Sequence, residues 1–259
     1  MDGLFKALLT AATVLLVMVA ARYGGRRVAG LVAALPTITA PTLAWLAHDE
    51  GMSFAISAAI GSVAACAMLA VFALGYARAA RYGGCLLALI CGVGGALAMA
   101  LPARAASTDL GWALVLALGS SALTFAAMPR MGAEVVPPRG RPRSMLLVAA
   151  SAGGLTALAT LIGPAMGGFA AGLLSSLPLI TGSVAMAEHA QGGHRASAHF
   201  LRGYVGGLFG KAAFGAVFVL LAPRTGALPA LSLACVCACL LSTVRPRLSG
   251  LVAPARVTR

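Results

Sequence analysis

Apolar runs of about 20 residues recur along this chain, and its charged residues are concentrated in the short gaps between them. A helix needs about 20 residues to cross the hydrocarbon core of a membrane. Only 10% of the residues are charged, whereas a soluble domain carries roughly 25%. Too few polar side chains are present to cover a surface in water, and the chain is too apolar to be disordered. The sequence therefore predicts an all-α polytopic membrane protein.

The apolar runs predict nine transmembrane helices. They lie near residues 4–21, 28–47, 53–76, 83–101, 110–128, 145–162, 168–187, 198–221 and 226–244. Nine helices use about 180 residues, so the remaining loops are too short to hold a soluble domain. Residues 1–22 also resemble a signal peptide, but they have a counterpart later in the chain, which favours a retained helix.

The Lys and Arg residues are distributed unevenly over alternate loops. Fifteen lie on one side of the nine predicted helices and three, Lys6, Arg104 and Arg224, lie on the other. By the positive-inside rule, the N-terminus is expected outside and the C-terminus in the cytoplasm. The same rule accounts for the net charge of +13. The arginines lie at helix ends rather than in a basic patch with aromatic residues, so no nucleic-acid partner is expected.

Two stretches of the chain are related at a constant offset of 142 residues. Residues 28–39 read VAGLVAALPTIT and residues 170–181 read AAGLLSSLPLIT, with seven identities in twelve positions. The offset maps predicted helices one to four onto helices six to nine and leaves helix five over. One extra crossing inverts the second copy, and an inverted repeat is typical of secondary transporters. We therefore expect a 4+1+4 repeat, with the first copy in 1–105, a linking helix and Pro/Arg-rich cytoplasmic loop in 106–143, and the second copy in 144–259.

A Leu-Pro segment lies near the middle of predicted helices two and seven. A proline inside a helix removes a backbone hydrogen bond and clashes with the preceding turn. At membrane depth, irregular backbone is tolerated only where it is packed in protein or lines a cavity. Paired breaks in two inverted copies therefore predict a central binding site, although the kinks can instead serve helix packing alone. The predicted substrate-binding residues here are Pro36, Thr37, Thr39, Pro41, Thr42, Pro178, Thr181 and Ser183, with Ser175 and Ser176 as weaker candidates one turn earlier.

Lys211 is the one charged residue placed well inside a predicted span, after a run of glycines that allows close helix packing. Its counterpart in the repeat is Leu69, so it breaks the symmetry. A lysine at this depth is costly. We expect it to act on the substrate or in proton coupling; the alternative is a structural lysine that pairs with another helix.

Clusters of titratable residues end the two helices that contain the Leu-Pro segments. These candidates for a gate or proton relay are His48, Asp49, Glu50, Glu188 and His189, and the alternative is that they are solvated helix ends. His189, His194 and His199 are five residues apart, which suits no familiar zinc motif. The six cysteines lie in apolar runs without CxxC spacing. No metal and no cofactor are therefore expected.

The segment Val28–His48 resembles the GlpM-like small membrane proteins of bacteria. The resemblance is carried by its Ala-Gly-Leu and Leu-Pro-Thr sequences and by a His about twelve residues after the Pro. Those proteins have four helices and about half this length, so the chain looks like a doubled version, in which Pro178 remains but Leu179 replaces the Thr. The resemblance implies a bacterial inner-membrane location and a possible role in the cell envelope.

These features predict a secondary transporter of a small solute, with anions among the candidate solutes. The alternative is an envelope scaffold or accessory protein for surface-polymer production that does not transport. An enzyme is not expected, because the chain lacks HExxH, GxSxG and an intramembrane aspartate pair. The expected partners are the lipid bilayer, a small-molecule solute and possibly a second copy of the chain.

Overall fold

The computed structural model describes residues 25–128 and 165–251, together with single residues and pairs within 5–23 and 150–162. The predicted helices near 4–21 and 145–162 and the loop 129–143 lie almost wholly outside the described residues. Within the described ranges all regular secondary structure is helical, which confirms the all-α prediction. The helices are α2 (Gly25–Ala33), α3 (Thr39–Asp49), α4 (Met52–Ala79), α5 (Cys85–Arg104), α6 (Leu110–Ala127), α8 (Gly168–Leu174), α9 (Leu179–Thr225) and α10 (Ala227–Leu251).

Four described helices are long and apolar enough to cross a membrane: α4, α5, α6 and α9 from Thr181 onward. A shorter apolar helix covers Ala227–Ser242 within α10. These helices indicate a membrane-embedded protein. The total of nine spanning helices stays a prediction.

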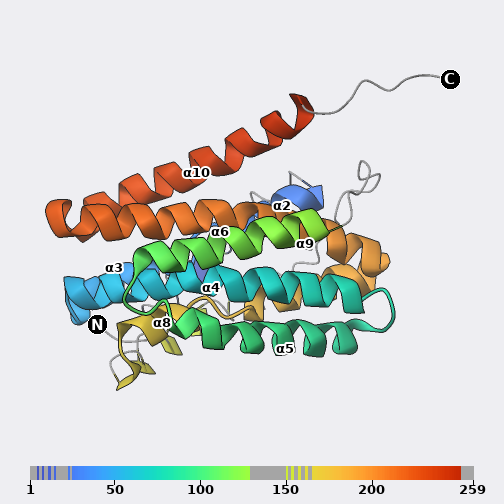
Figure 1. The fold of residues 1–259 in the computed structure, drawn as a ribbon, viewed down its shortest axis with the longest axis horizontal. Coiled ribbons are helices and arrows are strands. Elements are labelled where there is room, and N and C mark those ends of the chain that lie inside the picture. The colour runs from blue at the N-terminus through green and yellow to red at the C-terminus, as the bar shows by residue number, and fades with distance from the viewer. Residues whose placement is uncertain are drawn as a thin grey trace.

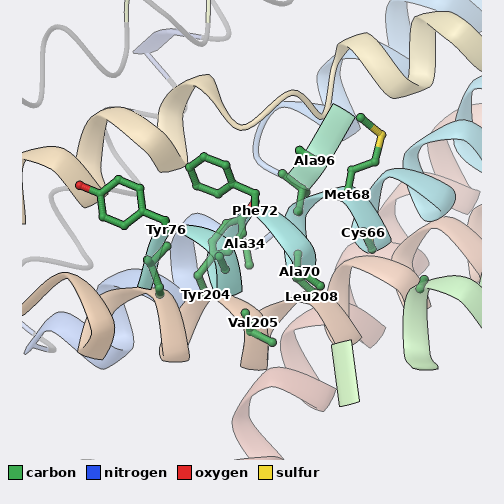
Figure 2. Close-up of a cluster of buried hydrophobic side chains, with 14 of the residues drawn as sticks. Ala34, Cys66, Met68, Ala70, Phe72, Tyr76, Ala96, Tyr204, Val205 and Leu208 are labelled. Carbon is green, nitrogen blue, oxygen red and sulfur yellow. The ribbon is translucent and has the colours of Figure 1, made fainter. Parts of the chain in front are cut away.

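Helices α4 and α9 form the centre of the bundle (Figure 1). They run antiparallel, because Gly215 near the end of α9 approaches Ala59 near the start of α4, while Tyr76 near the end of α4 contacts His189 near the start of α9. Figure 2 shows the core between them, where Phe72 and Tyr76 of α4 lie near Tyr204 and Val205 of α9. The centre of the protein is therefore built from one helix of each predicted copy.

Helices α5 and α10 lie at opposite edges of the bundle, α5 along α4 and α10 along α9 (Figure 1). Both present large apolar side chains outward, including Leu86, Leu97 and Ile90 on α5 and Leu228 and Val236 on α10. Such a surface is unfavourable in water and favourable against lipid tails. The two outer helices thus supply large exposed apolar surfaces.

The helix breaks expected from the Leu-Pro segments are present. Helix α2 ends at Ala33 and α3 begins at Thr39, and α8 ends at Leu174 before α9 begins at Leu179. The prolines fall inside the two gaps, at Pro36 and Pro178. Each proline lacks a backbone N–H and disfavours helical geometry in the residue before it. Two interrupted helices therefore reach the middle of the bundle.

The connection expected between the seventh and eighth predicted helices, around 188–197, is shorter in the structure. Element α9 consists of two helices that meet at a kink, where only Gly193 leaves helical geometry, with φ 71° and ψ −173°. Gly51, just before α4, has φ 91°. Glycine tolerates positive φ without a steric penalty, so one residue is enough to redirect the chain. The two glycines are 142 positions apart, the spacing of the sequence repeat.

Two close crossings lock the central helices to the short helices α2 and α8. A Cβ atom at Gly30 of α2 would collide with the carbonyl oxygen of Phe200 in α9 and approach the amide of Tyr204. A Cβ atom at Gly172 of α8 would collide with the carbonyl oxygen of Ala58 in α4 and approach the amide of Ser62. The residues of the second crossing correspond to those of the first at the 142-residue offset, but the copy that supplies the glycine in one crossing supplies the facing backbone in the other.

Candidate functional site

Lys211 lies in the middle of the second part of α9 and is only 7% exposed. Its Nζ donates a hydrogen bond to Ser176 Oγ over 3.0 Å. The neighbouring Gly207 and Gly210 allow α2 and α10 to approach α9 closely, which encloses the lysine in protein. The structure thus places the predicted intramembrane charge at the second helix break.

Ser176 belongs to the non-helical segment between α8 and α9. Its Oγ also lies 3.3 Å from Ser62 Oγ, on α4. Both serines are buried. A hydroxyl can accept one hydrogen bond and donate another, so Ser176 connects the lysine of α9 to the serine of α4 through the break.

Three further buried polar side chains extend from this connection through Cys66. Cys66, one turn after Ser62 on α4, donates from Sγ to the Ser62 carbonyl oxygen over 3.6 Å. Thr181, at the start of α9, shares a side-chain hydrogen bond with Tyr204. Figure 2 shows Cys66 and Tyr204 lying among apolar core side chains. The central polar cluster is defined here by six side chains: Ser62, Cys66, Ser176, Thr181, Tyr204 and Lys211.

Among the described residues no carboxylate pairs with Lys211, and Ser176 accepts its hydrogen bond. An ammonium has three N–H donors, and one neutral hydroxyl oxygen satisfies only one of them. A buried charge is stabilised by an opposite charge or by several hydrogen bonds. The cluster therefore has unused capacity to interact with an anion.

The first helix break has a different, more apolar environment. Pro36, Thr39 and Thr42 are buried, whereas Thr37 and Pro41 are half-buried. The Thr42 hydroxyl donates to the Ile38 carbonyl oxygen over 2.9 Å, within its own helix. At the positions equivalent to Ser176 and Lys211 the first copy has Ala34 and Leu69, both buried in the apolar core. The predicted residues of the first break are therefore not brought into the central polar cluster by any hydrogen bond of the described residues.

The remaining predicted residues of the second break divide between the cluster and the surface. Pro178 and Thr181 are buried, and Thr181 belongs to the cluster. Ser183 is exposed. Two serines that the sequence ranked low or passed over, Ser176 and Ser62, contact each other at the centre instead.

The two predicted gate clusters also differ. His48, Asp49 and Glu50 are exposed at the end of α3, whereas Glu188 and His189 are half-buried. His189 Nδ1 lies 3.4 Å from the Tyr76 hydroxyl of α4, and the two rings meet edge to face. The contact joins the first part of α9 to the far end of α4. Tyr76 was not singled out from the sequence, where nothing distinguishes it from other aromatic core residues.

Arg202 fastens α6 to this end of α9. Its guanidinium donates to the carbonyl oxygens of Phe125 and Met128, over 3.2 and 2.7 Å, and it lies over the Phe125 ring. Carbonyl groups at the end of a helix lack partners within the helix. Arg202 therefore provides hydrogen-bond donors for the carbonyl oxygens at the end of α6.

The described residues contain no group of three or more His, Cys, Asp or Glu side chains that could hold a metal ion. The site is instead made of hydroxyls, one thiol and one lysine. Its chemistry suits recognition of a charged solute better than coordination of a cation. Comparison of the chain with protein-family models, curated proteins and solved structures gives no match.

Proposed function

We propose that this protein is a secondary transporter of a small anion, in which two inverted copies of a four-helix unit enclose a site at Lys211. The observation that carries the proposal is the hydrogen bond from Lys211 Nζ to Ser176 Oγ, at 3.0 Å. It brings the single buried lysine of the described residues to an interrupted helix. Interrupted helices that meet near the bilayer midplane are the usual place of substrate binding in transporters built from repeats.

The reciprocal glycine crossings support the inverted repeat. A two-fold rotation that exchanges Gly30 with Gly172 also exchanges Phe200 with Ala58 and Tyr204 with Ser62. Because α4 and the second part of α9 are exchanged and lie antiparallel, the axis of that rotation runs across the helices. If both helices cross the bilayer, the axis lies in the membrane plane, as in inverted-topology transporters.

The charges at the two ends of the bundle support an orientation. Arg78 lies in the last turn of α4 and Arg81 just after it, and Arg195 lies six residues after His189, which contacts that end of α4. Arg104 and Arg224 lie at the ends of α5 and α9, toward the start of α4. By the positive-inside rule the end of α4 faces the cytoplasm, here that of a bacterial inner membrane.

The preference for an anion follows from the charge of the site. Lys211 is a point charge with three N–H donors, and the hydroxyl of Ser176, itself in contact with that of Ser62, lies beside it. No carboxylate of the described residues neutralises it. A single negative charge on the solute would complete the site.

Flux into proteoliposomes tests the proposal. The probes are labelled chloride, nitrate, gluconate and, as a divalent contrast, succinate. The wild type is expected to carry at least one monovalent probe, and Lys211→Met to lower its initial rate by more than about tenfold, because one partner of a buried charge pair is removed. The matched control is Leu69→Met, at the repeat-equivalent buried position, which conserves core volume and should retain wild-type flux.

Two results would contradict the proposal. Equal rates for Lys211→Met and wild type would remove Lys211 from the site. Absence of flux for every probe, together with a stable complex of the protein with other envelope proteins in mild detergent, would favour the envelope-scaffold alternative.

A further inference from the structure

The buried lysine carries a second consequence, which rests on the proposed transport function. Between transport events the empty site has to change its accessibility without an anion. In that state an ammonium at Lys211 would be enclosed in protein with one neutral hydroxyl, Ser176 Oγ, as its partner in the described residues. Burying a charge without an opposite charge is unfavourable. A neutral amine avoids that cost.

The groups around Lys211 provide no negative charge that would favour the ammonium over the neutral amine in the empty site. From α4, Cys66 faces it, and its Sγ donates to the Ser62 carbonyl oxygen, so the thiol carries its proton. Helices α6 and α8 contain no titratable residue. The titratable residues of α2 are arginines, and α4 carries Tyr76 and Arg78 near its end. Those of α5 are Cys85, Cys91 and Arg104, and those of α10 are Cys235, Cys237, Cys239, Arg245 and Arg247. Besides Tyr204, α9 carries Glu188, His189, His194, Arg195, His199, Arg202 and Arg224, all at least nine positions from Lys211 along the chain. Tyr204, on α9 itself, is hydrogen-bonded with Thr181.

We propose that Lys211 couples transport to protons, so that each monovalent anion crosses the membrane with one proton carried on Nζ. The proton enters from the aqueous side to which the site is open and forms an N–H bond with the amine lone pair. The anion then pairs with the resulting ammonium, and Ser176 Oγ accepts a hydrogen bond from one of the ammonium N–H groups. On the other side the anion leaves and the N–H bond breaks, returning the proton to water. The loaded and the empty site both carry no net charge, and nothing is oxidised or reduced.

The first experiment measures proton uptake on anion binding. Purified protein in weakly buffered detergent near neutral pH receives sodium chloride, sodium nitrate or sodium gluconate, and a pH indicator reports the change. The wild type should take up one proton for each anion bound, whereas Lys211→Met should take up none. Leu69→Met should match the wild type.

The second experiment uses proteoliposomes and a carried probe from the same three salts. With the membrane voltage clamped by potassium and valinomycin, one unit of inward pH gradient should sustain about tenfold accumulation of the anion. A change of voltage at constant pH should leave the flux unaltered. Lys211→Arg, whose guanidinium keeps its proton, should retain exchange of internal for external anion but lose net accumulation by at least about tenfold.

The outcomes separate the coupling from the transport. Two outcomes would overturn the proton coupling and leave anion transport intact. One is an anion flux that depends on voltage but not on the pH gradient. The other is net accumulation by Lys211→Arg at the wild-type level. A wild type that neither binds nor carries any of the probes overturns the proposed function and the coupling together.

Discussion

The hydroxyl of Ser176 holds the central polar cluster together. It accepts a hydrogen bond from Lys211 Nζ over 3.0 Å and lies 3.3 Å from Ser62 Oγ. Both contacts are buried. A polar group left without a partner in such a place costs more than its hydrogen bond contributes. The stability of the helix break is therefore linked to the lysine.

Replacement of Ser176 tests that link. Ser176→Ala should lower the free energy of unfolding by about 1–3 kcal/mol, because it leaves Lys211 without its partner. Combined with Lys211→Met, the same change should cost less, since no buried donor remains. Chemical unfolding in detergent measures the double-mutant cycle.

The control for this cycle is Ser175→Ala. The Ser175 hydroxyl donates to the Gly172 carbonyl oxygen, over 2.9 Å, within its own helical turn. Its effect should add to that of Lys211→Met within about 0.5 kcal/mol. Equal coupling energies of Lys211 with Ser175 and with Ser176 would contradict the hydrogen bond between Lys211 and Ser176.

The sequence identified some of these residues and not others for a physical reason. Lys211 is conspicuous because a charge inside an apolar run is expensive. Ser62 is not, because a small hydroxyl residue in a membrane helix commonly bonds to its own backbone. Which serine contacts the lysine depends on how α4 crosses α9. The geometry of that crossing cannot be predicted from the sequence of either helix alone.

At the level of the elements, glycine sets how closely the short helices approach the central ones. Gly30 of α2 faces the backbone of α9, and Gly172 of α8 faces the backbone of α4. Backbone atoms, unlike long side chains, cannot rotate away from an added methyl group. Each crossing is therefore intolerant of a side chain.

Alanine substitutions at these glycines should be destabilising. Gly30→Ala and Gly172→Ala should each lower the free energy of unfolding by about 1–3 kcal/mol or more through overpacking. The matched controls are Gly94→Ala and Gly119→Ala, where a Cβ atom meets nothing within 4 Å. These helical positions should gain up to about 1 kcal/mol from better helix propensity. Thermal unfolding in detergent compares the four variants, and equal midpoints would contradict the close crossings.

The helix breaks were accessible to sequence analysis, whereas the shortness of the connection between the two parts of α9 was not. Pro36 and Pro178 disrupt a helix wherever they stand inside one. The polar stretch around 188–197 looks like a loop, because charged and glycine residues gather there. In the structure all of it is helical except Gly193. Tertiary packing overrides this local composition.

In the whole molecule, helices of equal hydropathy take opposite positions. The apolar windows of α4 and α5 both have a mean hydropathy of 2.2, yet 78% of the first and 17% of the second are buried. Lipid tails and protein interior are equally apolar surroundings, so hydropathy predicts membrane insertion but not which helix lies inside. Side-chain size gives a further signal: α4 is rich in Ala, whereas α5 presents leucines outward.

The proposed arrangement of the two copies makes a direct claim about the membrane faces. Tyr82 follows the end of α4 and Arg224 lies at the end of α9, and both are exposed. They are equivalent at the 142-residue offset. If the copies are inverted, equivalent residues lie on opposite faces of the bilayer.

Thiol labelling of these two positions in intact cells tests the account most directly. The variants Tyr82→Cys and Arg224→Cys are made in a background without the six native cysteines and treated with a membrane-impermeant maleimide. The account predicts that Arg224→Cys reacts from outside and that Tyr82→Cys reacts only after the membrane is permeabilised. Reaction of both cysteines from the same side would contradict the inverted repeat and the site built upon it.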